Sequence, residues 1–254
     1  MDTPGGPRIV SLLSLSASGV PNGVRVPLRV ADRPFAALRP GAPATVGARE
    51  IVVGGQTYRM TRTWRTAVPP VRLCRQALAV LAGRLADLAI GVPLQRVRAL
   101  ASALTAGDPR SAIRGLVGVG NGLTPGGDDI IAGTMVGLRA VGRTVLLQQV
   151  RRAVGADVGD RTTAVSADLL RLAAAGQAGT ESLALLGALH AARPGIRGIS
   201  RLDVLHSALD KLLSIGHTSG ADLATGLLLG LGTADAERGL LPLPGSIPAA
   251  VVIA

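Results

Sequence analysis

Two segments of the chain carry the same spacing of aspartate and glycine, and this spacing restricts how the helices that contain it can pack. The matching residues are Asp129, Gly133 and Gly137 in the first segment, and Asp222, Gly226 and Gly230 in the second. Residues four positions apart lie on one face of a helix, so each segment predicts a helix with a glycine face. Glycine inside a helix lowers stability by up to about 1 kcal/mol relative to alanine. Close packing of a second backbone against the glycine can offset this loss. We therefore predict that helices 129–138 and 222–231 pack against each other through these faces.

A glycine-rich loop precedes each of the two predicted helices. Residues 118–129 read Gly-Val-Gly-Asn-Gly-Leu-Thr-Pro-Gly-Gly-Asp-Asp, and residues 216–220 read Gly-His-Thr-Ser-Gly. Backbone N–H groups and the positive end of the helix dipole favour anions at a helix start. Packing of the helices would bring loops 120–127 and 216–220 side by side at one site. Because aspartates in the first turns oppose the positive field, we predict a small polar substrate rather than a bare polyanion.

Polar side chains in these loops are candidates for catalysis and binding. Asp128 and Asp129 could orient a substrate amide, hold Mg²⁺ or accept a proton, and His217 could transfer a proton. Helix capping is the structural alternative, because Ser219 followed by Asp222 fits a capping box. The predicted catalytic residues are Asp128, Asp129 and His217. The predicted substrate-binding residues of the loops are Asn121, Gly122, Thr124, Gly126, Gly127, Thr218, Ser219, Gly220 and Asp222.

The rest of the chain predicts an α+β fold. Residues 8 to about 66 carry short β-branched runs, and Gly54-Gly55 is typical of a two-residue hairpin. After Pro69-Pro70, apolar residues recur at helical spacing. Helices are predicted at 71–88, 94–105, 109–117, 127–151, 162–175, 180–192, 200–214 and 220–231. We therefore predict a β-rich region over residues 1–69, a helical domain over 70–238 and a proline-rich tail over 239–254.

Composition narrows the class of protein. Hydrophobic residues make up 48% of the chain but only three residues are aromatic, so the core must be aliphatic. The formal charge of +11 comes from scattered arginines without interleaved aromatic residues, which does not indicate nucleic-acid binding. Cys74 is the only cysteine, so we expect no disulfide or cysteine-based zinc site, as suits the cytoplasm.

The apolar run near the N-terminus faintly resembles a secretory signal. It extends from Ile9 to Leu15 after a single arginine, but Ser11 and Ser14 interrupt it and Asp2 opposes the positive charge. We predict that this run is a buried strand. No apolar run of the chain approaches the roughly 20 residues of a membrane span, so we expect no membrane association.

The motif Gly-Asn-Gly-Leu-Thr-Pro-Gly-Gly-Asp-Asp at residues 120–129 resembles the signature loop of the AllH family, a subunit family of oxamate carbamoyltransferase. Arg161-Thr162-Thr163, followed by Ser166 and Leu169-Leu170, is similar to the middle segment of that family. Residues 218–222, Thr-Ser-Gly-Ala-Asp, are similar to its C-terminal segment. The resemblance extends over roughly residues 8 to 232.

This resemblance implies a role in carbamoyl transfer between oxalurate and phosphate, which yields oxamate and carbamoyl phosphate in allantoin degradation. It implies two partner subunits, no cofactor and a small anionic substrate, which would be carbamoyl phosphate, phosphate or an oxamate-like molecule. It also adds Arg161, Thr162 and Thr163 to the predicted substrate-binding residues, with Arg161 pairing with an anion. The Ser-Thr-Arg-Thr motif of aspartate and ornithine carbamoyltransferases is absent, so any carbamoyl-phosphate site here would be an independent solution.

Two other functions stay open at this point. The chain could be a non-catalytic interaction subunit whose glycine loops form an interface with its partners. It could also transfer phosphoryl groups with Mg²⁺ on Asp128 and Asp129. Adjacent residues of a helix project roughly 100° apart, which makes joint ligation of one ion awkward, although Mg²⁺ can be held by one carboxylate with water and phosphate oxygens. The sequence leaves the metal requirement unknown.

Overall fold

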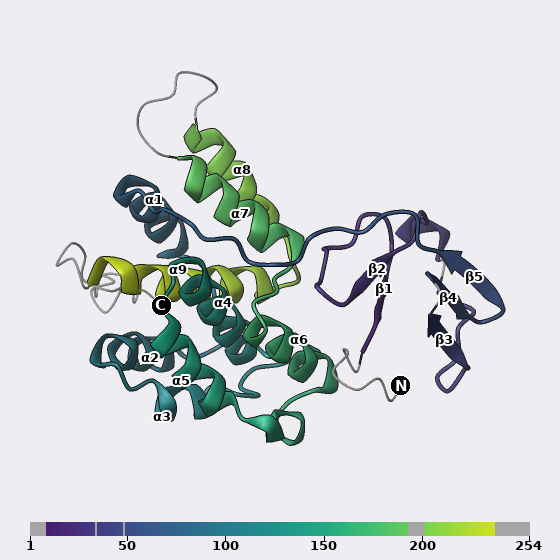
Figure 1. The fold of residues 1–254 in the computed structure, drawn as a ribbon, viewed down its shortest axis with the longest axis horizontal. Helices are drawn as coiled ribbons and strands as arrows, with labels where there is room; N and C mark the ends of the chain where they lie inside the picture. Colours follow the sequence, from purple (N-terminus) through teal and green to yellow (C-terminus); the bar gives the residue numbers. More distant parts are fainter. Residues whose placement is uncertain (1–8, 34, 48, 193–200, 237–254) are drawn as a thin grey trace.

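The computed structural model describes residues 9–33, 35–47, 49–192 and 201–236. Within these residues, short strands occupy the N-terminal part and helices form the remainder (Figure 1). This arrangement confirms the predicted α+β class. The division at residue 69 stays a prediction, and the predicted tail at 239–254 lies outside the described residues.

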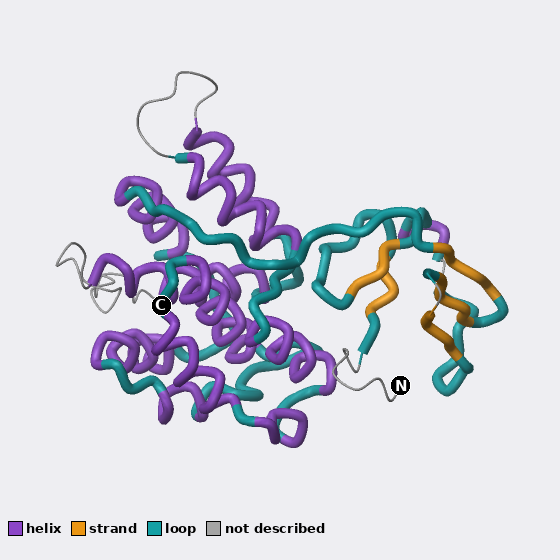
Figure 2. Tube along the Cα trace, in the orientation of Figure 1, coloured by secondary structure: helices purple, strands orange, loops and turns teal. Residues whose placement is uncertain are grey.

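The strands form two small sheets at one end of the molecule (Figure 2). Strand β1 (Ser11–Leu13) pairs in parallel with β2 (Gly23–Arg25), and β3 (Ala44–Gly47), β4 (Glu50–Val53) and β5 (Gln56–Arg59) form an antiparallel meander. A short 3-10 turn, η1 (Val30–Asp32), lies between the sheets. Gly54 and Gly55 join β4 to β5 at φ values of 57° and 76°, which confirms the two-residue hairpin. The predicted buried strand at 9–15 is wrong in length and burial, because only residues 11–13 pair and they are half-buried.

The helical part contains these elements: α1 (Arg75–Leu85), α2 (Leu94–Ala106), α3 (Arg110–Arg114), α4 (Gly126–Ala140), α5 (Thr144–Val154), η2 (Ala156–Asp160), α6 (Ala164–Ala174), α7 (Thr180–Ala191), α8 (Arg201–Leu213) and α9 (Ser219–Ala236). The single helix predicted at 127–151 is wrong, because it divides into α4 and α5. Gly142 adopts a left-handed φ of 74°, and the Arg143 N–H donates to Leu138 O over 2.9 Å. This is the hydrogen bond that commonly closes a helix at a left-handed glycine.

Helices α4 and α9 lie in the middle of the helical part, with α5 and α6 against α4 and with α1 and α8 against α9 (Figure 1). Their glycine faces meet, as predicted. A Cβ atom on Gly137 would lie 3.0 Å from Gly230 Cα, and one on Gly226 would lie 2.9 Å from Thr134 N. Because Gly133 faces Gly226 while Gly137 faces Gly230, the two helices run parallel and begin at the same end.

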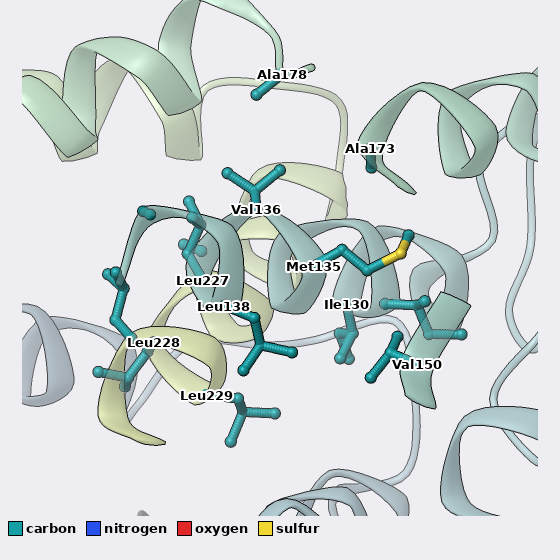
Figure 3. Packing of buried hydrophobic residues seen from close by; sticks show 14 of the residues in the cluster. Ile130, Met135, Val136, Leu138, Val150, Ala173, Ala178, Leu227, Leu228 and Leu229 are labelled. Carbon is teal, nitrogen blue, oxygen red and sulfur yellow. The ribbon is translucent and has the colours of Figure 1, made fainter. Parts of the chain in front are cut away.

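The core around this pair is aliphatic, as composition predicted. Side chains such as Ile130, Met135, Leu138 and Leu227 fill the space around α4 and α9 (Figure 3). No aromatic residue of the described part is among its buried hydrophobic residues. None of the helices in the described part combines the length and the apolar character that a membrane span requires.

The N-terminal part is tied to the helical part by hydrogen bonds. The Val68 N–H donates to Gly176 O over 2.9 Å, and the Ala178 N–H donates to Thr66 O over 2.8 Å. The Asn22 side-chain amide donates to Asp168 Oδ2 over 3.0 Å in a buried setting. These contacts hold residues 19–22 and 66–68 against the segment that carries α6 and the start of α7.

The glycine contact predicts unequal effects for the same substitution in two helices. Gly226→Ala would place a methyl group against the α4 backbone, so we expect a loss of about 1–3 kcal/mol in the free energy of unfolding. Gly83→Ala in α1 is the matched control, since nothing lies within 4 Å of its Cβ position. Alanine there should be neutral or stabilising by up to about 1 kcal/mol. Urea unfolding measures both values, and equal effects would contradict the close backbone contact.

Candidate functional site

The two glycine-rich loops lie side by side where α4 and α9 begin. The Thr124 and Ser219 hydroxyl oxygens are 3.1 Å apart, and both side chains are half-buried. A Cβ atom on Gly126 would lie 2.8 Å from Asp222 Oδ2. The first contact confirms the predicted juxtaposition of residues 120–127 with residues 216–220, and the second adds Asp222 to it.

Asp222, in the first turn of α9, has a fully buried side chain. Its Oδ1 accepts a hydrogen bond from the Gly91 N–H over 2.8 Å, whereas its Oδ2 has no partner. Burial raises the pKa of this carboxyl, while the Gly91 N–H and the Thr218 hydroxyl lower it. Asp222 thus bonds across to the loop between α1 and α2, rather than back to Ser219 as the capping alternative required.

Asp129, in the first turn of α4, is 6% exposed, and its Oδ2 also lacks a partner. Burial raises its pKa to about 7. Hydrogen bonds from the Ser219 and Thr124 hydroxyls lower the pKa, and the charges of Asp222 and Asp128 raise it. A carboxyl with this pKa exists in both protonation states near neutral pH and can exchange a proton with a ligand.

Asp128 has different surroundings, although it is the next residue along the chain. Its Oδ1 accepts from the Gly118 N–H over 2.8 Å, and its Oδ2 accepts from the hydroxyls of Thr162 and Ser166. Both oxygens are therefore used within the protein, and the side chain is buried. These hydrogen bonds join the signature loop to the start of α6, as expected of a structural carboxylate. They do not support the predicted catalytic role of Asp128.

The segment around Arg161 supports the signature loop from the other side. The Arg161 guanidinium donates to Val154 O over 3.2 Å and to Arg114 O over 3.3 Å. Thr163 accepts from the Ser166 N–H over 3.1 Å as the cap of α6, and its hydroxyl donates to Leu123 O. Of Arg161, Thr162 and Thr163, Thr162 bonds Asp128. The side chains of the other two bond backbone carbonyls of Val154, Arg114 and Leu123, so these hydrogen bonds support the loop rather than reach toward Asp129 or Asp222.

Of the other predicted residues, some are exposed to solvent and others have backbone N–H groups that bond within the loops. Asn121, Gly122 and His217 are exposed. The Gly127 N–H donates to Val119 O over 2.8 Å, and the Gly220 N–H donates to Ile215 O over 3.0 Å. These two N–H groups are therefore occupied, which weakens the prediction that they bind an anion.

Gly91 is the site residue that the sequence analysis missed. It precedes Val92, Pro93 and the start of α2, where a glycine indicates an ordinary turn, so the sequence contains no signal of a site there. A Cβ atom there would lie 2.8 Å from Asp222 Oδ2 and 2.9 Å from Thr218 Oγ1. The site thus comprises Thr124, Gly126, Asp129, Thr218, Ser219 and Asp222 among the predicted residues, together with Gly91.

The positions of these side chains give little support to the predicted Mg²⁺ site. In the part of the chain that the structure describes, no group of three or more histidine, cysteine or acidic side chains is placed to hold an ion. Asp128 is bonded to Gly118, Thr162 and Ser166 rather than turned toward Asp129's neighbours on α9. Joint ligation of Mg²⁺ by Asp128 and Asp129 stays a prediction without support from these contacts.

Residues 116–231 match the family model described as oxamate carbamoyltransferase subunit AllH. Over these residues the chain is similar to the AllH family. The match contains the signature loop, the Arg161 segment and the start of α9, which are the features that suggested this family from the sequence. It begins after Gly91 and the strands, so the wider resemblance from residue 8 is not part of it. No curated protein and no solved structure matches the chain.

The raised pKa of Asp129 predicts a pH-dependent stability. Between the ordinary pKa of 3.8 and about 7, the folded protein keeps a proton that the unfolded chain has released. The stability that this proton contributes is present below pH 4 and is lost as the pH rises toward 7. Asp129→Asn removes the titration, so relative to the wild type it should gain a few kcal/mol in unfolding free energy between pH 4 and pH 8. Urea unfolding at several pH values measures this, with exposed Asp87→Asn as the control; equal pH profiles for wild type and Asp129→Asn would contradict it.

Proposed function

We propose that this chain is a subunit of a carbamoyltransferase-type enzyme that acts on oxalurate or oxamate and carbamoyl phosphate, or on a related small anionic amide. The family supports the reaction class, because its description names oxamate carbamoyltransferase. The observation that carries a catalytic role is Asp129, a buried carboxyl with a pKa of about 7 where two helices begin. Protein partner subunits would complete the enzyme, since the family's description is that of a subunit.

The chemistry needs a group that both takes up and releases a proton. When a phosphate oxygen attacks the carbamoyl carbon of oxalurate, the C–N bond to the oxamate nitrogen breaks. The phosphate loses a proton, and the departing nitrogen gains one. A single carboxyl with a pKa near 7 can perform both transfers, and Asp129 is the group in this site that meets the requirement. His217 is the alternative proton carrier, from the adjacent exposed loop.

Charge that develops on the carbamoyl oxygen requires hydrogen-bond donors placed in advance. The N–H groups of Gly127 and Gly220 are already used in the loops. The Thr124 and Ser219 hydroxyls are half-buried next to Asp129, and Asp129 no longer needs both as donors once it has taken up a proton, so we assign the donor role to them. The anionic end of the substrate would then lie toward solvent, where the chain's positive charge or a partner subunit can contact it.

One observation favours the alternative of a non-catalytic interaction subunit. Leu123, at the tip of the signature loop, is 73% exposed and lies next to exposed Asn121 and Gly122. An exposed leucine on an ordered loop fits contact with a partner subunit. The two functions are compatible if the loop tip binds the partner while Asp129 faces the substrate.

Reconstitution with the partner subunits tests the catalytic role. Asp129→Asn should lower kcat by about a hundredfold or more, because an amide cannot transfer the proton. Asp87→Asn, on the exposed surface after α1, should leave kcat unchanged. Release of carbamoyl phosphate from oxalurate measures the rate, and size-exclusion chromatography checks that each variant still assembles. Full activity in an assembled complex with Asp128→Asn, Asp129→Asn and His217→Ala would reject the catalytic role and leave the interaction subunit.

A further inference from the structure

Two carboxyl oxygens at the start of α4 and α9 are buried without a hydrogen-bond partner. They are Oδ2 of Asp129 and Oδ2 of Asp222. Oδ1 of Asp222 accepts from the Gly91 N–H, and hydroxyls lie near both carboxyls: Thr218 near Asp222, and Ser219 and Thr124 near Asp129. An unpartnered buried acceptor is destabilising, and more so when it is charged. Two such oxygens in the first turns of neighbouring helices therefore leave a strong demand for hydrogen-bond donors.

The fold places each of the two carboxyls next to the start of the other helix. Asp222 of α9 lies against Gly126, the first residue of α4. Asp129 of α4 accepts from Ser219, the first residue of α9. Each aspartate thus lies at the N-terminus of the other helix, and their charges interact. The glycine contact between the helices prevents the two carboxyls from moving apart without breaking the core.

The kind of ligand follows from what the two oxygens lack. A carboxylate or phosphate would bring more acceptors and more negative charge to a place that already has both. A primary amide or ureido nitrogen brings two N–H donors in one plane and no charge. Its neighbouring carbonyl oxygen can accept from the Thr124 or Ser219 hydroxyl.

We propose that Asp129 and Asp222 together bind the amide nitrogen of a small carboxamide or ureido substrate, and that they reject a carboxylate of the same shape. This rests on the proposed function, to which it adds Asp222 as a residue that determines substrate specificity. Thr124 and Ser219 are half-buried, as are Gly91 and Thr218, whereas both aspartates are buried, so the ligand would reach the carboxyls past these half-buried residues.

Oxamate and oxalate provide the test, because they differ only in that an amide replaces a carboxylate. Isothermal titration of the full chain at pH 7.5 should give a Kd for oxamate at least about tenfold lower than that for oxalate. Asp222→Asn supplies an amide donor in place of an acceptor, so it should abolish or reverse this preference. Asp87→Asn, which is exposed after α1, should keep it. Circular dichroism and thermal unfolding confirm that each variant is folded.

Three results would overturn the proposal: equal binding of the two anions by the wild type, tighter binding of oxalate, or binding of neither at millimolar concentration. An unchanged preference in folded Asp222→Asn would also overturn it, even if the wild type prefers oxamate. Failure of the proposed function looks different. In that case the reconstituted complex transfers no carbamoyl group, while the chain still prefers oxamate to oxalate.

Discussion

The direct contact between the backbones of α4 and α9 is the constraint on which the rest of the structure depends. Gly133, Gly137, Gly226 and Gly230 remove the side chains that would otherwise separate the two helices. Parallel helices place their like dipole ends together, which is unfavourable by itself. Close packing and a continuous aliphatic core offset this cost, because the residues around the seam are buried leucine, isoleucine, valine and methionine.

Parallel packing also determines the electrostatic environment of Asp129 and Asp222. Two helix N-termini at one end produce a positive field, and Asp129 and Asp222 supply negative charge within it. Burial nevertheless dominates their titration, since the pKa of both carboxyls is raised. The same contact that stabilises the fold therefore keeps two acidic side chains out of water. The stability of the fold and the raised pKa of both carboxyls therefore share one structural cause.

Asp128 connects this seam to the other segment that marks the family. Its hydrogen bonds from Gly118, Thr162 and Ser166 fix the signature loop against the start of α6. A Cβ atom at Gly118 would run into Arg161 O, so the glycine is required by this contact as well as by its left-handed φ of 75°. The residues that resemble the family's motifs thus form a network around Asp128, which is separate from the buried carboxyl of Asp129. Replacement of either Asp128 or Asp129 would therefore change different contacts of the same loop.

The sequence by itself determined the α+β class, the aliphatic core and the pairing of the two glycine-faced helices, because composition and four-residue spacing act locally. It also indicated the loops that meet at Thr124 and Ser219. Only the tertiary structure decided that neighbouring Asp128 and Asp129 differ, since side chains about 100° apart on a helix face different neighbours. Only the tertiary structure brought Gly91 to Asp222, 131 residues away, because a contact at that separation leaves no local pattern.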